Sequence, residues 1–387
     1  MMIRKSIQKK VLFVRAQPII KGPTYDRIPA LLSDKHFTVA YLGWDREKKY
    51  SPKENNGHYL ICRFQHASGA GWSKYAGFVR FWLWIFRFAR RWCPDVIHAC
   101  DINVILPALL YKFIAGKKMV FQLYDFSADE QLAGHPLFKS VFGWIEKHLI
   151  SLADGVILVS EAQRSRQLSG IRLKKELVVH NTPADLLCET RGRAGPRRRR
   201  GRLCICYGGN VRDSRGLDTL CRVAIDRPFD VIVAGGGPYL NTLKERYDRH
   251  KNITFLGEIS HRDILLSASQ SDVIYACYKP IRNNVNMVIG SPNKYFESLM
   301  LGKPLITNEE SGIAVSVRDS DTGFTVPYDD VHALETLLFS LNNKKREIES
   351  RGKRARRIYE ERYHWSFYQK KILRFYHSLW KGRNEYE

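Results

Sequence analysis

The sequence predicts an α/β protein built from two Rossmann-like, doubly wound parallel-sheet domains, and three observations lead to this fold class. The chain has 387 residues, more than one hydrophobic core usually organises, because domains of roughly 100–200 residues are the norm. Short apolar runs rich in β-branched residues alternate with helical patterns in both halves, as parallel sheets require. The segment RGRAGPRRRRGR (191–202) interrupts this alternation, which predicts a linker.

The apolar runs predict the strands in order. In the first half, strands are expected at residues 11–16, 38–43, 59–63, 96–99, 119–123, 155–159 and 177–180. In the second half, they are expected at residues 203–207, 229–234, 253–257, 273–277 and 304–308. Helical patterns separate most of these runs, so the chain contains two βαβ series.

The two series also predict the domain boundaries. Residues 1–187 are expected to form an N-terminal Rossmann-like domain, residues 188–202 an Arg-rich linker, and residues 203–362 a C-terminal Rossmann-like domain. Apolar side chains recur at helical spacing in residues 363–387, in the run RYHWSFYQKKILRFYHSLW. A final helix is therefore expected, and it is predicted to pack back on the N-terminal domain.

Composition restricts the class of protein and of partner. Hydrophobic residues make up 44% and charged residues 26% of the chain, which is ordinary globular usage and argues against a disordered or fibrous protein. The formal net charge is +24, and such a field attracts phosphates, anionic lipid headgroups or nucleic acid. The cysteines form no CxxC pair and no His–Cys spacing suited to zinc, so a reduced, cytosolic compartment is expected.

The N-terminus and the hydropathy pattern predict how the chain relates to membranes. The apolar run that follows the basic N-terminus is too short for a signal-peptide core and resembles a first strand. No segment approaches the ~20 apolar residues of a membrane-spanning helix. The expected location is cytoplasmic, with the protein either soluble or attached to a membrane surface.

Two loops of the second half follow strands, at the edge where open α/β sheets bind ligands. In YGGNVRDSRGLDTL, Gly208 and Gly209 permit close approach of a ligand, and Arg215 can reach a diphosphate. A plain strand-to-helix turn with a surface arginine explains this loop equally well. In AGGGPYLNTL, the glycines 235–237 resemble a phosphate cradle, but a tight turn is the favoured interpretation.

A third loop, SPNKYFESLMLGKPLI, carries a more specific combination of residues at the start of a predicted helix. A helix N-terminus and Lys294 stabilise the charge of a leaving nucleoside diphosphate, and a carboxylate one turn later, Glu297, can accept hydrogen bonds from ribose hydroxyls. The two side chains share one helix face at i and i+3. An ordinary surface Lys–Glu pair is the alternative, and the neighbouring loops favour the ligand site.

Several motifs occur in order along nearly the whole chain: DVIHACD, VILVSEA, YGGNVRDSRGLDTL, ITFLGEISHRDILLSASQSDVIYACY and SPNKYFESLMLGKPLI. Together they resemble the retaining family-four glycosyltransferases of the GT-B fold. The resemblance implies a donor site in the C-terminal domain, an acceptor site in the N-terminal domain and a cleft between them. It also implies that no metal or cofactor is required, because the nucleotide sugar is a co-substrate.

The resemblance carries site residues over by position. Arg215 and Lys294 match the diphosphate ligands, and Glu297 matches the ribose-binding glutamate. Gly22 falls in the loop that faces the donor phosphates, and Gly257 in the loop that holds the base. The donor-binding residues implied in this way are Gly22, Gly209, Asn210, Arg215, Gly257, Ser291, Pro292, Asn293, Lys294 and Glu297.

Two positions depart from the family pattern. Ile289 stands where many relatives carry a second glutamate near the sugar. Asn210 stands where relatives often have a second basic residue. The resemblance therefore does not identify the groups that bind the sugar hydroxyls.

The expected catalytic residues are Asp101, Asp125 and Glu297. In DVIHACD, relatives often have a second histidine where this chain has Cys100, which leaves Asp101 as the acidic member, and His98 is interpreted as structural. Asp125 follows the strand MVFQL, where a carboxylate can orient an acceptor hydroxyl or accept its proton. A capping role for Asp125 is equally supported. Same-face transfer assisted by the leaving phosphate is the reaction that the resemblance favours.

The segment WSKYAGFVRFWLWIFRFARRW is expected to form a helix with two apolar stripes. Its sheet-facing stripe is predicted to contain Tyr75, Phe78, Val79, Trp82, Ile85, Phe86 and Ala89. The other face interleaves aromatic residues with arginines, as helices at an anionic membrane surface do. This predicted membrane-facing set is Arg80, Phe81, Trp84, Arg87, Phe88, Arg91 and Trp92. Packing of this set on a neighbouring helix or a partner subunit is the alternative.

The predicted function is retaining, metal-independent hexosyl transfer from a nucleotide-sugar donor to a hydroxyl of a lipid-linked glycan, in polysaccharide or glycoconjugate synthesis. The expected place of this reaction is the cytosolic face of an anionic membrane. One alternative is a basic nucleic-acid-binding protein, but helix-turn-helix, RRM and KH signatures are lacking, so no nucleic-acid partner is expected. The other alternative is a GT-B relative that acts as an epimerase or phosphorylase.

Overall fold

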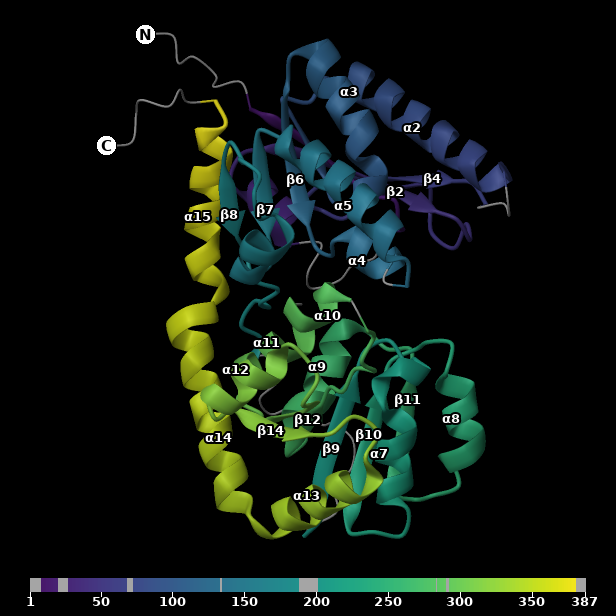
Figure 1. Ribbon diagram of the computed structural model, residues 1–387, viewed down its shortest axis with the longest axis vertical. Coiled ribbons are helices and arrows are strands. Elements are labelled where there is room, and N and C mark those ends of the chain that lie inside the picture. The colour runs from purple at the N-terminus through teal and green to yellow at the C-terminus, as the bar shows by residue number, and fades with distance from the viewer. Residues whose placement is uncertain are drawn as a thin grey trace. The chain divides into compact units, whose positions relative to one another are not determined.

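The computed structural model describes residues 8–19, 27–67, 72–132, 134–187, 201–282, 284–289 and 292–380. They form two compact units, one of Met1–His180 with Tyr368–Glu387 and one of Asn181–Phe367 (Figure 1). Each unit has one sheet with helices on both faces, so the predicted α/β class with two parallel-sheet domains is confirmed. The chain passes between the units before the Arg-rich segment, of which residues 188–200 lie outside the described part.

The sheet of the first unit has the order β3-β4-β2-β1-β5-β6-β7-β8. Only the pairing of β3 with β4 is antiparallel among the described strands. Central strands are buried on both faces and therefore consist of continuous apolar runs, whereas the short, polar β3 (KEN) has no such run and was not expected. The strands are β1 (Lys10–Val14), β2 (Thr38–Asp45), β3 (Lys53–Asn55), β4 (Leu60–Gln65), β5 (Val96–Ala99), β6 (Lys118–Leu123), β7 (Gly155–Leu158) and β8 (Glu176–Val178).

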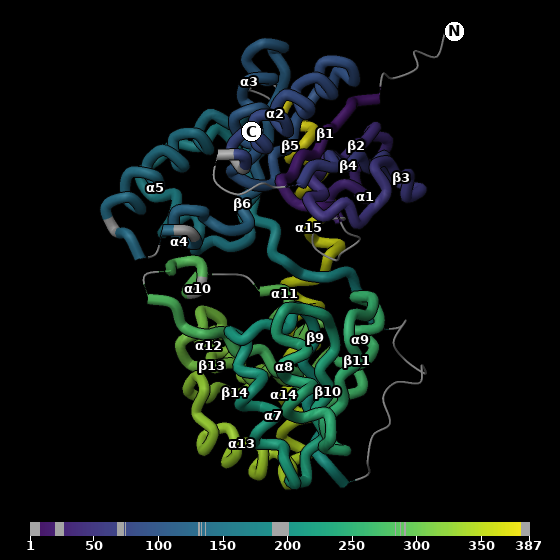
Figure 2. The backbone as a smooth tube through the Cα atoms, turned by 90° about the vertical axis from the view of Figure 1, so that its right-hand side faces the viewer, coloured from purple at the N-terminus to yellow at the C-terminus, as the bar shows by residue number. Residues whose placement is uncertain are grey.

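Helices cover both faces of this first sheet. Right-handed crossovers after β4, β5 and β6 place α2, α3 and α5 on one face, and α1 and α15 lie on the other. The yellow helix α15 passes beside β5 (Figure 2), where the Tyr376 hydroxyl lies 2.5 Å from His98 Nδ1. The helices are α1 (Arg27–Asp34), α2 (Trp72–Trp92), η1 (Ile102–Val104), α3 (Ile105–Ala115), α4 (Ser127–Gln131), α5 (Pro136–Ser151), η2 (Gln163–Gln167) and α15 (Trp365–Ser378).

The sheet of the second unit is wholly parallel, in the order β11-β10-β9-β12-β13-β14. The order reverses direction between β9 and β12, so this sheet has a switch point at which α/β proteins bind ligands. Strand β14, with the sequence GFTV, was not expected. The strands are β9 (Leu203–Gly208), β10 (Phe229–Ala234), β11 (Ile253–Gly257), β12 (Val273–Tyr275), β13 (Leu305–Asn308) and β14 (Gly323–Val326).

Two hydrophobic cores lie on opposite faces of the second sheet. One packs the strands against α7, α8 and α13, and the other packs them against α9, α11, α12 and α14. This double layer leaves the carboxyl ends of the strands and the N-termini of several helices at one edge. The helices are η3 (Asp213–Arg215), α7 (Leu217–Ala224), α8 (Leu240–Tyr247), α9 (His261–Gln270), α10 (Val285–Ile289), α11 (Asn293–Leu301), α12 (Ile313–Asp319), α13 (Val331–Asn343), α14 (Lys345–Ile358) and η4 (Tyr359–Tyr363).

The predicted faces of helix α2 are partly wrong. Phe81, assigned to the membrane-facing set, is 0% exposed and packs 5.0 Å from the Trp44 ring. Tyr75 and Val79, assigned to the sheet, are 65% and 51% exposed. The core-facing positions follow an i, i+4 spacing through Phe81, Ile85 and Ala89, and a helix that is apolar on most sides gives periodicity little power to select this face.

The rest of the predicted membrane-facing set divides into aromatic and basic residues. The rings of Trp84, Phe88 and Trp92 are half-buried and follow one another at 6.3 and 6.2 Å along the edge of the core. Arg80, Arg87 and Arg91 are exposed. The aromatic rings therefore pack on the protein, and the arginines face solvent.

Candidate functional site

The glycine-rich loops after β9 and β10 pack backbone against backbone. Gly209 donates to the carbonyl of Ala234 at 2.8 Å. A Cβ on Gly235 would lie 2.0 Å from the Gly209 oxygen, and one on Gly237 would lie 2.3 Å from the Val211 oxygen. The glycines 235–237 are therefore accounted for as a tight turn that supports the β9 loop, in agreement with the favoured interpretation.

Two cations from different loops lie close together beside the β9 loop. Lys294, at the start of α11, has its Nζ 4.9 Å from the centre of the Tyr207 ring. Arg215, in η3, lies 4.7 Å from the centre of the Tyr278 ring. A Cβ on Gly209, whose φ is +130°, would lie 2.8 Å from the lysine Nζ, so any side chain at this position would displace the lysine.

The electrostatics of this cation pair favour an anionic ligand. Burial lowers the pKa of Lys294 to about 8, with Glu297 opposing the shift and the charge of Arg215 adding to it. The Nε of Arg215 is buried and has no hydrogen-bond partner among the described residues. A buried donor without a partner is costly, and a phosphate oxygen is the kind of acceptor that guanidinium groups bind.

Glu297 lies one turn further along α11 and has a partner that sequence reasoning missed. The side chain is only 8% exposed, and its Oε1 lies 2.8 Å from the Nε2 of His261. A carboxylate only accepts, so His261 carries its proton on Nε2 in this contact. His261 follows the N-cap Ser260 at the start of α9, and a strand end followed by Ser-His at the ligand edge is the signal that could have identified it.

The remaining predicted donor residues surround these groups. Pro292 is the N-cap of α11, and Asn293 is its first residue. Gly257 ends β11 with a φ of +71° and open space where a Cβ would lie. Asn210 has an exposed side chain, and its carbonyl accepts from the Tyr207 hydroxyl at 2.6 Å. Gly22 and Ser291 lie outside the described residues.

In the first unit, Asp125 stands at the carboxyl edge of the sheet, directly after β6. Its side chain reaches solvent, but restricted hydration and then the charge of Glu130 raise its pKa to about 6. Arg15, which sequence reasoning missed, acts in the opposite direction and lies 5.4 Å from the centre of the Tyr124 ring. Only the position of Arg15 directly after the first strand could have indicated it.

Asp101 makes structural contacts, and its predicted catalytic role stays a prediction. Its carboxylate accepts from the N–H groups of Ala16 at 2.8 Å and Asn103 at 2.9 Å, so it caps η1 and anchors the end of β1. His98 is structural, as interpreted from the sequence. It is fully buried, its ring stacks on Phe13, and burial lowers its pKa to about 3.

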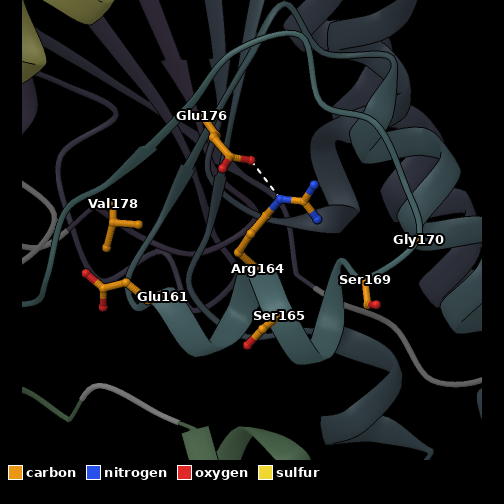
Figure 3. Close-up of a pocket in the computed structure, with 7 residues that line it drawn as sticks. All are labelled: Glu161, Arg164, Ser165, Ser169, Gly170, Glu176 and Val178. Carbon is orange, nitrogen blue, oxygen red and sulfur yellow. Dashed lines mark hydrogen bonds and ion pairs between the residues drawn. The ribbon is translucent and has the colours of Figure 1, made fainter.

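A shallow depression of about 480 Å³ opens beside β8 in the first unit (Figure 3). Arg164 and Glu176 face each other across it, with Nε donating to Oε2 at 2.8 Å. Glu161 at its rim lies 3.1 Å from the His180 ring. The charges around this depression are thus paired with one another, which makes it a weaker ligand site than the edge that carries Arg215 and Lys294.

None of the helices within the described ranges combines the length and the apolar character needed to cross a bilayer.

Comparisons with known proteins identify a family and a fold that this chain resembles. Residues 203–342 match the family described as glycosyl transferases group 1. Over 290 residues, the chain is 23% identical to a glycogen synthase of Mycobacterium tuberculosis, covering 71% of this chain and 67% of the relative. Over 167 residues, it is 24% identical to the O-antigen biosynthesis glycosyltransferase WbnH of Escherichia coli, covering 42% and 46% of the two chains.

Solved structures show the same architecture. Sucrose-phosphate synthase from Thermosynechococcus elongatus aligns with a TM-score of 0.74 at 15% identity, covering 96% of this chain and 99% of that one. HepE of Anabaena, in a complex with UDP and glucose, aligns with a TM-score of 0.69 at 14% identity, covering 96% and 100%. These likenesses establish the GT-B fold. The chain therefore has the GT-B fold, and its residues 203–342 match the group 1 glycosyl transferase family.

Proposed function

We propose that the protein is a retaining glycosyltransferase of the family-four type, which binds a nucleotide sugar at the second unit and transfers the sugar to a hydroxyl of a lipid-linked glycan. One observation carries the proposal: Arg215 and Lys294 lie together at the ligand edge, and the buried Nε of Arg215 has no partner among the described residues. Two neighbouring cations repel each other, and a diphosphate placed between them would relieve that repulsion.

Each part of the donor has a matching group in this proposal. The diphosphate contacts Arg215, Lys294 and the N-terminus of α11, whose free N–H groups favour anions. Glu297, oriented by His261, accepts hydrogen bonds from the ribose hydroxyls. The base lies against Gly257, where open space adjoins the backbone. UDP-glucose is the first donor to test, because HepE is described in a complex with UDP and glucose.

The proposed reaction proceeds on one face of the sugar. The bond between the anomeric carbon and the diphosphate oxygen breaks, and the acceptor oxygen forms its bond from the same side. The acceptor proton passes to the departing phosphate oxygen, so atoms and charge balance. Lys294 and Arg215 stabilise the charge that develops on the diphosphate, and groups of this kind contribute roughly 3–4 kcal/mol to a transition state.

The acceptor is proposed to bind at the first unit, at the cytosolic face of a membrane. Asp125 has an exposed side chain at the carboxyl edge, and its pKa of about 6 leaves it mostly ionised at neutral pH, so it can orient an acceptor hydroxyl. The likeness to an O-antigen biosynthesis enzyme supports a glycan acceptor. O-antigen-like glycans are hydrophilic, and an attached lipid would keep them at the membrane surface.

A screen of nucleotide sugars for protection against thermal unfolding tests the proposal. Binding to the folded state alone raises the melting temperature, so one donor should stand out from the panel. Arg215→Ala should abolish that protection, and Arg222→Ala, an exposed arginine on α7, is the matched control. Protection that is equal in both variants would reject this site. Donor hydrolysis or epimerisation without an acceptor product would favour the epimerase alternative.

A further inference from the structure

The outer faces of α3 and α5 carry large apolar side chains that remain exposed to solvent. Their exposed fractions range from 42% at Ile145 to 83% at Leu137. The spacing is helical in both cases, so each helix has a second apolar stripe opposite its core stripe. This exposed apolar face consists of Leu106, Leu110, Phe113 and Ile114 on α3, and of Leu137, Phe138, Val141, Trp144 and Ile145 on α5.

The two stripes lie on helices that cover the same face of one sheet. Both helices lie on the same face of the first sheet (Figure 1), and the Lys112 ammonium of α3 donates to the Leu152 carbonyl at the end of α5 at 2.5 Å. Single exposed apolar residues are normal on soluble proteins, but nine of them at helical spacing on two helices of one sheet face indicate an interaction surface.

The charges exposed on α2, α3 and α5 are positive, whereas the neighbouring α4 carries the exposed Glu130. Helices α2, α3 and α5 contain a single carboxylate, Glu146, and it is buried, where it accepts from the N–H groups of Ser127 and Ala128. The neighbouring helix α2 instead presents exposed arginines to solvent, at positions 80, 87, 90 and 91. The surface is thus apolar at its centre and cationic at its side.

We propose that the exposed apolar face of α3 and α5 inserts into the interfacial layer of an anionic lipid bilayer, while the arginines of α2 contact lipid phosphates. This combination answers both properties of the surface, since a bilayer offers acyl chains and negative charge together. A second copy of the chain would bring like charges into contact, and nucleic acid offers phosphates but no apolar layer. The membrane contact is therefore centred on α3 and α5 and not on the aromatic residues of α2.

The exposed apolar face also extends to the edge of the sheet where the acceptor is proposed to bind. Leu137, Phe138 and Val141 lie in the first turns of α5, and helix N-termini lie at the carboxyl edge of the strands. Glu146 ties α5 to the start of α4, directly after Asp125. Bound lipid is thereby held near the edge where Asp125 stands. This last step rests on the proposed function, because it takes the acceptor to be lipid-linked.

Flotation of the full chain with vesicles tests the membrane contact. Wild type should bind vesicles that contain phosphatidylglycerol, and binding should fall about tenfold or more in Phe138→Ser/Val141→Ser, since apolar insertion supplies much of the interfacial affinity. Arg87→Glu/Arg91→Glu should lose binding in the same assay and respond little to added salt. Both pairs are exposed, so thermal melts should match the wild type.

Val315→Ser/Phe367→Ser is the matched control, because it removes one exposed aliphatic and one exposed aromatic side chain from the second unit. This control should bind vesicles like the wild type. Undiminished binding of Phe138→Ser/Val141→Ser would overturn the proposal. The proposal would also be overturned if the wild type were a dimer, Phe138→Ser/Val141→Ser were a monomer, and neither bound vesicles. Vesicle binding without any nucleotide-sugar turnover would instead reject the proposed function and leave the membrane surface standing.

Discussion

Lys294 is a cation in surroundings that disfavour its charge. Burial is the main cause, the charge of Arg215 adds to it, and together they lower its pKa to about 8, although Glu297 opposes the shift. Residue types in the motif SPNKYFES were enough to predict Lys294 and Glu297, because their spacing along a helix is fixed. His261 could not be predicted with the same ease, since its contact with Glu297 joins two helices that are 36 positions apart.

The lowered pKa of Lys294 predicts a pH dependence of donor binding. Below pH 8 the lysine is charged in the free protein, and above pH 8 it must take up a proton to bind the diphosphate. Affinity for a nucleoside diphosphate should therefore fall as pH rises, by about 30-fold between pH 7 and pH 9.5. Calorimetric titration measures this fall. In Lys294→Arg the charge persists, so a profile as steep as that of the wild type would contradict the assignment.

Glu297 should recognise the ribose of the donor and not its phosphates. Wild type is expected to prefer a nucleoside diphosphate over its 2′,3′-dideoxy form by about 10- to 100-fold, as hydrogen bonds to a charged group of ~1.5–3 kcal/mol imply. Glu297→Ala should bind both forms equally. His261→Ala should give an intermediate preference, because the carboxylate then keeps its charge but loses its orientation. An unchanged preference in Glu297→Ala would remove this residue from the ribose site.

At the scale of elements, strands were more predictable than helix faces. Most apolar runs became strands within one or two residues, because buried parallel strands tolerate little besides apolar residues. The faces of helix α2 were assigned only partly correctly, since its apolar residues surround most of the helix and packing against Trp44 selects the face. The exposed stripes of α3 and α5 could not be separated from core stripes by sequence, because both have helical spacing.

The observed orientation of α2 predicts a contrast in stability. Phe81→Ala should lower the free energy of unfolding by about 3–5 kcal/mol, because it leaves a cavity in the core of the first unit. Tyr75→Ala, in the same helix but 65% exposed, should change it by less than about 0.5 kcal/mol. Urea unfolding followed by fluorescence of both variants measures the two values. A larger effect of Tyr75→Ala than of Phe81→Ala would mean that the helix is turned as the sequence pattern suggested.

The whole molecule combines a fold that was predictable with a surface that was not. Two βαβ series and a set of motifs in order were enough to predict two parallel-sheet domains and the edge that holds Arg215 and Lys294. The place of the strongly positive, apolar surface depends on which side chains the packing of α2, α3 and α5 leaves exposed. Net charge alone named a class of partner but no location.

Sugar transfer from the nucleotide-sugar donor should not depend on a metal ion. Arg215, Lys294 and the N-terminus of α11 supply positive charge where a divalent cation would otherwise neutralise the diphosphate. Turnover should therefore persist in excess EDTA, at a rate within about twofold of the untreated enzyme. Loss of activity that manganese restores, with magnesium and calcium as further additions, would show that the phosphate site has been misread.

The most direct test of the central claim is to follow one transfer reaction by nuclear magnetic resonance from its first minutes. The protein, the donor selected by the thermal screen and a glycan acceptor are combined, and the coupling constant of the new anomeric proton is recorded before any slow equilibration. The account predicts a new glycoside with the anomeric configuration of the donor, formed by the wild type and by Arg222→Ala but not by Arg215→Ala. A product of inverted configuration, or release of free sugar with no glycoside, would contradict it.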